Sequence, residues 1–160
     1  MLKFLSLLLI ITASFLCGKQ QSDAIYEKLT FHEGMLSLLG DIKRCVILYR
    51  MTLNEIIGLC EHEVLRKSGF LNDCLQHGID RAYHDYKESF GFDTFSDKRM
   101  VDFIRCLGSL SVSEQIVACE EMIELLKKDY DAKVERYPNQ RKLYLTLGTT
   151  IGLGIVIMLV

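Results

Sequence analysis

The last eighteen residues, Leu143 to Val160, carry no charge, and this run constrains the fold more than any other feature of the chain. As a helix rising ~1.5 Å per residue, it would span about 27 Å, close to the ~30 Å hydrocarbon core of a bilayer. Three basic residues, Arg136, Arg141 and Lys142, lead into it. The sequence therefore predicts a transmembrane anchor over residues 143–160.

A second apolar segment lies near the N-terminus, from Phe4 to Leu16, with Lys3 before it and Lys19 after it. Its length suits a secretory signal peptide as well as a short membrane span. The small-residue cleavage signal is marginal, so we favour an uncleaved anchor over residues 1–18. The alternative is an exported helical domain with a cleaved signal peptide and a single C-terminal membrane anchor.

The charged residues indicate which side of the membrane the middle of the chain occupies. All 21 acidic residues lie between Asp23 and Glu135, and the formal net charge of −2 lacks the basic excess of a nucleic-acid-binding protein. The inner ends of the two apolar segments carry more Lys and Arg than the outer ends, which favours a cytoplasmic position for residues 19–142. Six cysteines without paired spacing agree with a reducing compartment.

Residues 19–142 show no strand alternation and contain one proline, Pro138, so we expect an all-α domain. Apolar residues at spacings of three and four predict a first helix that continues out of the membrane. Its inward stripe is Ile25, Leu29, His32, Leu36, Leu39, Ile42, Val46 and Tyr49. Four further helices follow, and together they predict a compact antiparallel helical bundle flanked by the two membrane helices.

Two helix starts have a capping-box sequence, in which a Ser or Thr and a Glu three residues later satisfy each other's free backbone amides. Thr52 and Glu55 open the second predicted helix, and Ser111 and Glu114 open the fifth.

Other residues mark where helices end or bend. Ser68-Gly69 should separate the second helix from a third over residues 70–89, and Ser96 is the expected N-cap of the fourth. Gly108 should end the fourth helix. Pro138 removes a backbone hydrogen bond, which predicts a kink or brief break before the last span.

Cysteine lies near histidine at Cys60–Glu63 and at Cys74–His77. Zinc would need four converging ligands, and both cysteines fall on stripes that should face the core. No phosphate-binding loop is present. We therefore expect no catalytic residue, metal or cofactor, with a small membrane-bound metalloenzyme as the remaining catalytic alternative.

Gly148 and Gly152 are four residues apart in the last predicted span, as in the small-residue motif that lets membrane helices approach closely. They are either tolerated glycines in a lone anchor or a packing face against the N-terminal helix or a partner.

Three sequence stretches resemble the stage III sporulation protein AB family: Leu107 to Gln115, Lys142 to Gly148, and the closing residues from Gly152. Members have a leucine-glycine turn, a capping residue followed four positions later by glutamine, and a lysine-leucine-tyrosine approach to a glycine-bearing final span. The capping box at the second helix and the chain length also fit. The structural-motif residues carried over are Thr52, Glu55, Gly108, Ser111, Gln115, Tyr144, Gly148 and Gly152.

This resemblance implies a role in endospore formation. Such proteins belong to the channel complex between mother cell and forespore, and their cytoplasmic domain is similar to the F domain of the type II secretion inner-membrane platform protein. The implied function is a non-enzymatic scaffold or adaptor in the mother-cell membrane around the forespore. Its implied partners are a stage III sporulation protein AA-like ATPase and other membrane proteins of the channel.

Overall fold

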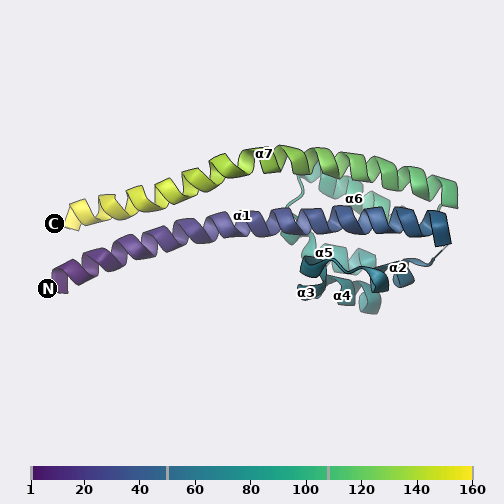
Figure 1. The fold of residues 1–160 in the computed structure, drawn as a ribbon, viewed down its shortest axis with the longest axis horizontal. Helices are drawn as coiled ribbons and strands as arrows, with labels where there is room; N and C mark the ends of the chain where they lie inside the picture. The colour runs from purple at the N-terminus through teal and green to yellow at the C-terminus, as the bar shows by residue number, and fades with distance from the viewer. Residues whose placement is uncertain (1, 50, 108, 160) are drawn as a thin grey trace. The chain divides into compact units, whose positions relative to one another are not determined.

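A computed structural model describes residues 2–49, 51–107 and 109–159, with side chains over residues 9–48, 51–107 and 109–158. The described residues are helical and contain no strand, so the all-α prediction is confirmed (Figure 1). The helices are α1 (Leu2–Tyr49), α2 (Leu53–Leu59), α3 (Glu63–Lys67), α4 (Phe70–His77), α5 (Ile79–Phe90), α6 (Thr94–Cys106) and α7 (Val112–Leu159).

The chain divides into two units. The first, here the paired-helix unit, comprises residues 1–27 and 133–160. The second, the core unit, comprises residues 28–132 and holds the main hydrophobic core. Both α1 and α7 begin in one unit and continue into the other as single helices.

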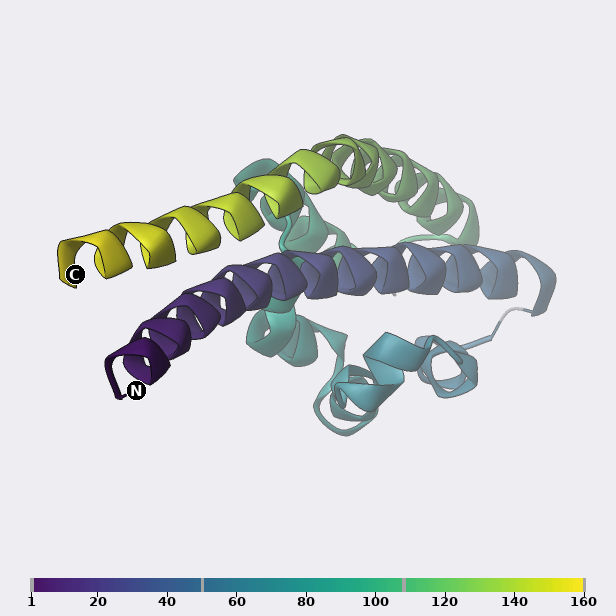
Figure 2. The ribbon, with the colours of Figure 1, turned by 60° about the vertical axis from the view of Figure 1, so that its left-hand side comes forward.

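In the core unit, α1 buries two adjacent faces. The predicted inward residues Leu39 and Ile42 are buried, but so are Phe31, Met35 and Leu38, which the predicted stripe omitted. The views in Figures 1 and 2 explain the wider face, because α2 to α4 lie on one side of α1 and the first part of α7 lies on the other. A helix packed from two sides needs a broader apolar surface than a single stripe.

The predicted second helix is two helices in the structure. α2 ends at Leu59, and the backbone is extended at Cys60 and at His62, the residue before α3. A β-carbon on Gly34 of α1 would lie 2.9 Å from both His62 Nδ1 and Leu65 Cγ, so α3 packs directly on a glycine of α1. The break between α2 and α3 allows Leu65 to pack against Gly34, where its side chain is fully buried.

The predicted third helix, residues 70–89, is also divided. Gly78 separates α4 from α5 with φ 87° and ψ 154°, a conformation that is essentially restricted to glycine. Leu75, near the end of α4, is 45% exposed. The predicted break at Ser68-Gly69 is present, since Gly69 has φ 89° and α4 starts at the next residue.

The N-cap of α6 is Asp93, and the prediction of Ser96 was wrong. The Asp93 side chain accepts a hydrogen bond from the Ser96 backbone N–H at 2.6 Å. The preceding loop is anchored by Phe90, which is fully buried and lies 5.2 Å from the ring of Phe70 and 5.7 Å from that of Phe31, measured between ring centroids.

Helix α7 runs through Pro138, so of the predicted kink or brief break before the last span the break is absent. Among the described residues, α7 is the helix long and apolar enough to cross a membrane, by length and composition. Of the first predicted anchor, residues 1–18, residues 2–18 form the start of α1, whereas residue 1 and the side chains of residues 2–8 lie outside the description.

Within the paired-helix unit, the start of α1 and the end of α7 lie side by side and run in opposite directions (Figure 2). Tyr26 and Tyr137 contact each other with ring centroids 6.0 Å apart. Further toward the chain ends, Gly18, Gly148 and Gly152 are buried between the two helices.

Candidate functional site

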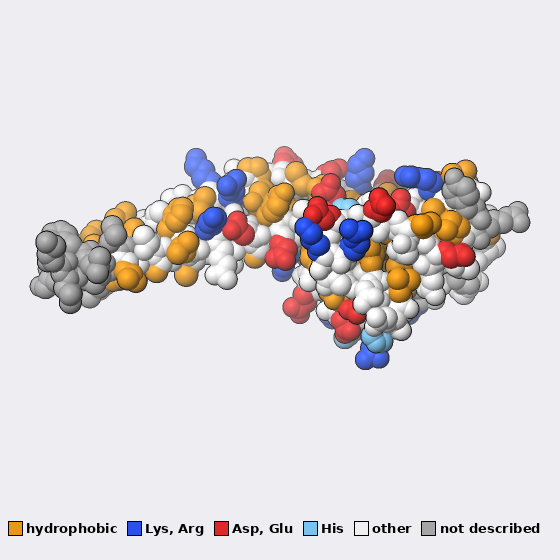
Figure 3. Space-filling view, turned by 60° about the horizontal axis from the view of Figure 1, so that its bottom comes forward, with side chains coloured by type: hydrophobic (Ala, Val, Ile, Leu, Met, Phe, Trp, Pro, Cys, Tyr) orange, Lys and Arg blue, Asp and Glu red, His pale blue; other side chains and the backbone are white. Residues whose placement is uncertain are grey.

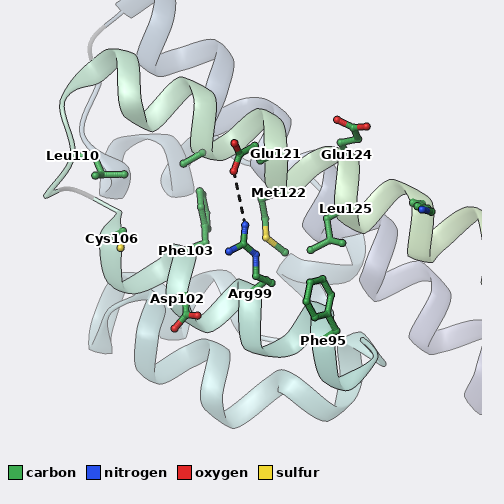
Figure 4. A pocket seen from close by; sticks show the side chains of 12 residues that line it. Phe95, Arg99, Asp102, Phe103, Cys106, Leu110, Glu121, Met122, Glu124 and Leu125 are labelled. Atoms are coloured by element: carbon green, nitrogen blue, oxygen red, sulfur yellow. Dashed lines mark ion pairs between the residues drawn. The ribbon is translucent and has the colours of Figure 1, made fainter.

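An apolar groove with a volume of about 640 Å³ lies in the core unit between α6 and the first part of α7 (Figure 4). Phe103 of α6 and Met122 of α7 form its floor and are nearly fully buried. Phe95 and Leu125 lie at one end, and Phe95 is 63% exposed. We call this surface the α6–α7 groove.

The spacing of residues along the two helices creates the groove. Phe95, Arg99 and Phe103 are four residues apart on α6, and Ala118 and Met122 are four apart on α7, so each set projects from one helix face. Figure 4 shows these faces turned toward each other, with the Phe103 ring and the Met122 side chain between the helices.

Charged side chains line the edges of the α6–α7 groove. Arg99 Nη2 lies 3.9 Å from Glu121 Oε2, across the space between the helices. Because both side chains are more than half exposed, this pair adds little stability. Asp102 and Glu124 lie further out. Together with the Arg99–Glu121 pair and Lys128, they give the lining three carboxylates and two cations.

The α6–α7 groove suits the binding of apolar side chains better than acid–base chemistry. Its lining contains one thiol, that of the exposed Cys106, and no histidine that could act as its base. A partner helix with apolar residues at spacings of three and four could fill the space between Phe95 and Leu125.

Sequence reasoning missed the α6–α7 groove because it placed Phe95 in the loop before the fourth helix. With Asp93 as the N-cap, Phe95 becomes the second residue of α6 and joins the Arg99–Phe103 face. The spacing of four to Arg99 was the available signal.

The predicted site residues lie in three separate places. Thr52 and Glu55 are at the start of α2, where Glu55 Oε2 accepts hydrogen bonds from the Thr52 N–H at 2.7 Å and hydroxyl at 2.8 Å. Both bonds stabilise the carboxylate and hold the pKa of Glu55 below its ordinary value, the backbone bond contributing most. Neither residue lines the α6–α7 groove.

Ser111 immediately precedes α7 and follows Leu110, which lines the α6–α7 groove. Glu114 Oε2 accepts from the Ser111 N–H at 2.9 Å and from its hydroxyl at 2.7 Å, and these bonds lower the pKa of Glu114. The Gln115 backbone N–H donates to the Ser111 carbonyl at 2.9 Å, which forms the first turn of α7. Gly108 lies outside the described residues.

Tyr144, Gly148 and Gly152 belong to the paired-helix unit and contact α1. A β-carbon on Gly148 would lie 2.7 Å from the backbone oxygen of Ser14, and one on Gly18 would lie 2.6 Å from that of Tyr144. These distances are shorter than real β-carbon contacts. Of the interpretations left open for the glycines, the structure favours packing against the N-terminal helix.

The Cys-His stretches do not converge in the structure. Cys60 and Cys74 are buried, and burial raises the pKa of the Cys74 thiol to about 12. Over the described ranges, no three His, Cys, Asp or Glu side chains are grouped so that they could hold a metal ion.

The fold and the α6–α7 groove define a helical protein with a surface for apolar side chains and one long helix apolar enough to cross a membrane. A family model for stage III sporulation protein AB matches residues 3–160, and the chain therefore belongs to the stage III sporulation protein AB family. No curated protein and no solved structure matches it. Family membership assigns the chain a role in sporulation.

Proposed function

We propose that this chain is a non-enzymatic, membrane-anchored scaffold of the channel between mother cell and forespore. Residues 1–18 and 143–160 would span the mother-cell membrane around the forespore, with the intervening domain in the cytoplasm. This domain would dock a secretion-type ATPase similar to stage III sporulation protein AA and contact other membrane proteins of the channel. Its similarity to the type II secretion F domain remains a prediction.

The observation that carries the proposal is the continuity of α1 and α7. Each is a single helix of 48 residues that begins or ends in the core unit and contributes its other end to the paired-helix unit. A partner bound to the core unit is therefore linked through two helices to the apolar chain ends. The packing of Ser14 and Gly18 on α7 also supports an uncleaved N-terminal segment.

The α6–α7 groove is the surface on which we expect the ATPase to dock. It combines an apolar floor with a net negative edge, since Asp102, Glu121 and Glu124 outnumber Arg99 and Lys128. A helix with an apolar stripe and flanking Lys or Arg residues would complement both properties.

A single substitution tests this docking surface. Phe95→Glu places a charge at the mouth of the α6–α7 groove, and Leu59→Glu is the matched control because Leu59 lies on α2 and is exposed to a similar degree, 64% against 63%. The affinity-tagged full-length chain from sporulating cells should retain the ATPase, as should Leu59→Glu. Phe95→Glu should reduce its recovery by about tenfold, equivalent to 1.4 kcal/mol.

Absence of the ATPase from the parent preparation, together with normal spore counts after deletion of the gene, would refute the scaffold proposal. Equal loss in both variants would instead show that Phe95 has no special role and would remove the α6–α7 groove as the docking surface.

The alternative is an exported helical domain with a cleaved signal peptide and a single C-terminal anchor. Both proposals share the anchor in α7, which meets the length and composition of a membrane span over the described residues. The two proposals place Cys106 on opposite sides of the membrane.

A further inference from the structure

Because α1 and α7 lie side by side, basic residues of the two helices lie at similar positions along the axis of the pair. Gly18 lies against Tyr144 and Gly148, so the adjacent Lys19 lies close to the level of Tyr144 along the pair. Arg141 and Lys142 come less than one turn before Tyr144 on α7. The three side chains are exposed, and the uncharged run begins immediately after Lys142.

Arg141 and Lys142 also line a shallow groove on the surface of α7, with a volume of about 340 Å³. Its other lining residues are Tyr137, Pro138 and Leu145, so no carboxylate is among them. We call it the Tyr137–Leu145 groove. The nearest acids in sequence are Glu135, six residues before Arg141, and Asp23, four residues after Lys19.

Figure 3 shows one face of the paired-helix unit, coloured by side-chain type. Between the grey residues at its end and the first Lys and Arg side chains, the surface drawn is hydrophobic or uncharged. Charged side chains, Lys and Arg with Asp or Glu beside them, therefore begin at the boundary of the apolar surface, which is the level where phospholipid headgroups lie against a membrane helix.

We propose that Arg141 and Lys142, supported by Lys19, bind the headgroup phosphate of an anionic phospholipid, with its upper acyl chain against Leu145. The proposal rests on the membrane insertion in the proposed function and adds a lipid class to it. The chemistry fits because Arg forms paired hydrogen bonds to phosphate oxygens and Lys adds a point charge. The apolar half of the Tyr137–Leu145 groove suits a lipid rather than free phosphate.

The absence of tryptophan from the chain allows a direct test. Leu145→Trp places a single fluorophore in the Tyr137–Leu145 groove, and Ile157→Trp places one near the other end of the apolar run, where the side chain is 76% exposed. Each full-length reporter is reconstituted in vesicles containing brominated phosphatidylglycerol or brominated phosphatidylcholine. Quenching by the bromine atoms reports which lipid contacts each position.

The Leu145→Trp reporter should show a preference of about fivefold or more for the anionic lipid, since each basic residue near the membrane surface adds about that factor. The Ile157→Trp reporter should be quenched by both lipids without preference. Arg141→Gln with Lys142→Gln should abolish the preference at position 145. Inorganic phosphate at constant ionic strength should leave it unchanged.

Arg66→Gln with Lys67→Gln is the matched control, because it removes another adjacent and exposed Arg-Lys pair, on α3 of the core unit. It should keep the full preference. If Leu145→Trp disturbs the helix, seen as lost circular dichroism, Thr149→Trp is the second reporter, four residues further into the uncharged run on the same face of α7.

Equal quenching by both lipids at position 145, or a preference that survives loss of Arg141 and Lys142, overturns the lipid site while leaving membrane insertion intact. A preference of the same size at position 157 does so too, because it indicates general enrichment of anionic lipid. Displacement by inorganic phosphate identifies an ordinary anion site and also overturns the proposal. If neither position is quenched by any lipid, the chain is not inserted and the proposed function fails as well.

Discussion

At the residue scale, the stability of the start of α7 depends on Ser111. We expect Ser111→Ala to cost about 1 kcal/mol by removing the oxygen that accepts from the Glu114 N–H, whereas Ser111→Asp keeps an oxygen acceptor there and should be nearly neutral. Thermal unfolding of the full-length chain in detergent, followed by circular dichroism, should show a decrease of about 2–4 °C for Ala. An unchanged midpoint for Ala would mean that α7 does not begin at Val112.

Helix caps were the part of the fold that the sequence predicted best, because an N-cap acts within four residues. Both capping-box positions precede helices in the structure. The wrong assignment at Ser96 shows the limit of such signals: Asp93 and Ser96 are both good N-cap residues three apart, and only the structure shows that Asp93 accepts from the Ser96 N–H.

At the scale of elements, we predict an order for the loss of thermal stability when the glycines of α7 are replaced by alanine. Gly148→Ala should lower the thermal midpoint most, because the added β-carbon would lie 2.7 Å from the Ser14 backbone oxygen and force the helices apart. We expect a cost of about 1–3 kcal/mol. Gly152→Ala should cost less, since its β-carbon would meet the Ser14 side chain at 3.0 Å.

Gly154→Ala is the control for this series, because a β-carbon there meets nothing within 4 Å. Alanine also favours the helix over glycine, so its midpoint should stay equal or rise. Full-length variants in the same detergent, compared by thermal unfolding, give the order directly. A loss at Gly154 as large as at Gly148 would contradict close packing of α1 on α7.

Helix breaks were harder to predict because their causes lie elsewhere in the chain. The break between α2 and α3 follows from packing of His62 and Leu65 on Gly34, 28 residues earlier than His62. Neither Cys60 nor Glu61 is a residue type that commonly ends a helix, such as glycine or proline. Gly78 did carry one, but a single glycine within a periodic pattern is compatible with a helix, so periodicity alone favoured the continuous interpretation.

At the scale of the whole molecule, the continuity of α1 was predicted from the sequence, whereas the continuity of α7 through Pro138 and the α6–α7 groove were not. Periodicity along one helix identifies its apolar residues, but it does not say which of them a neighbouring helix covers. Met122 is covered, while Phe95 remains exposed at the mouth of the groove. That difference depends on how α6 lies on α7, which no local pattern encodes.

The position of the core unit relative to the membrane can be tested with the chain's own thiols. Cys106 is exposed, whereas burial raises the pKa of Cys74 to about 12 and that of Cys119 to about 11, so these two thiols should react slowly. In a Cys17→Ser background, an impermeant maleimide should leave Cys106 unlabelled in intact cells and label it after permeabilisation. Cys106→Ser should remove that signal. Labelling of Cys106 in intact cells would place the core unit outside the membrane and establish the exported alternative.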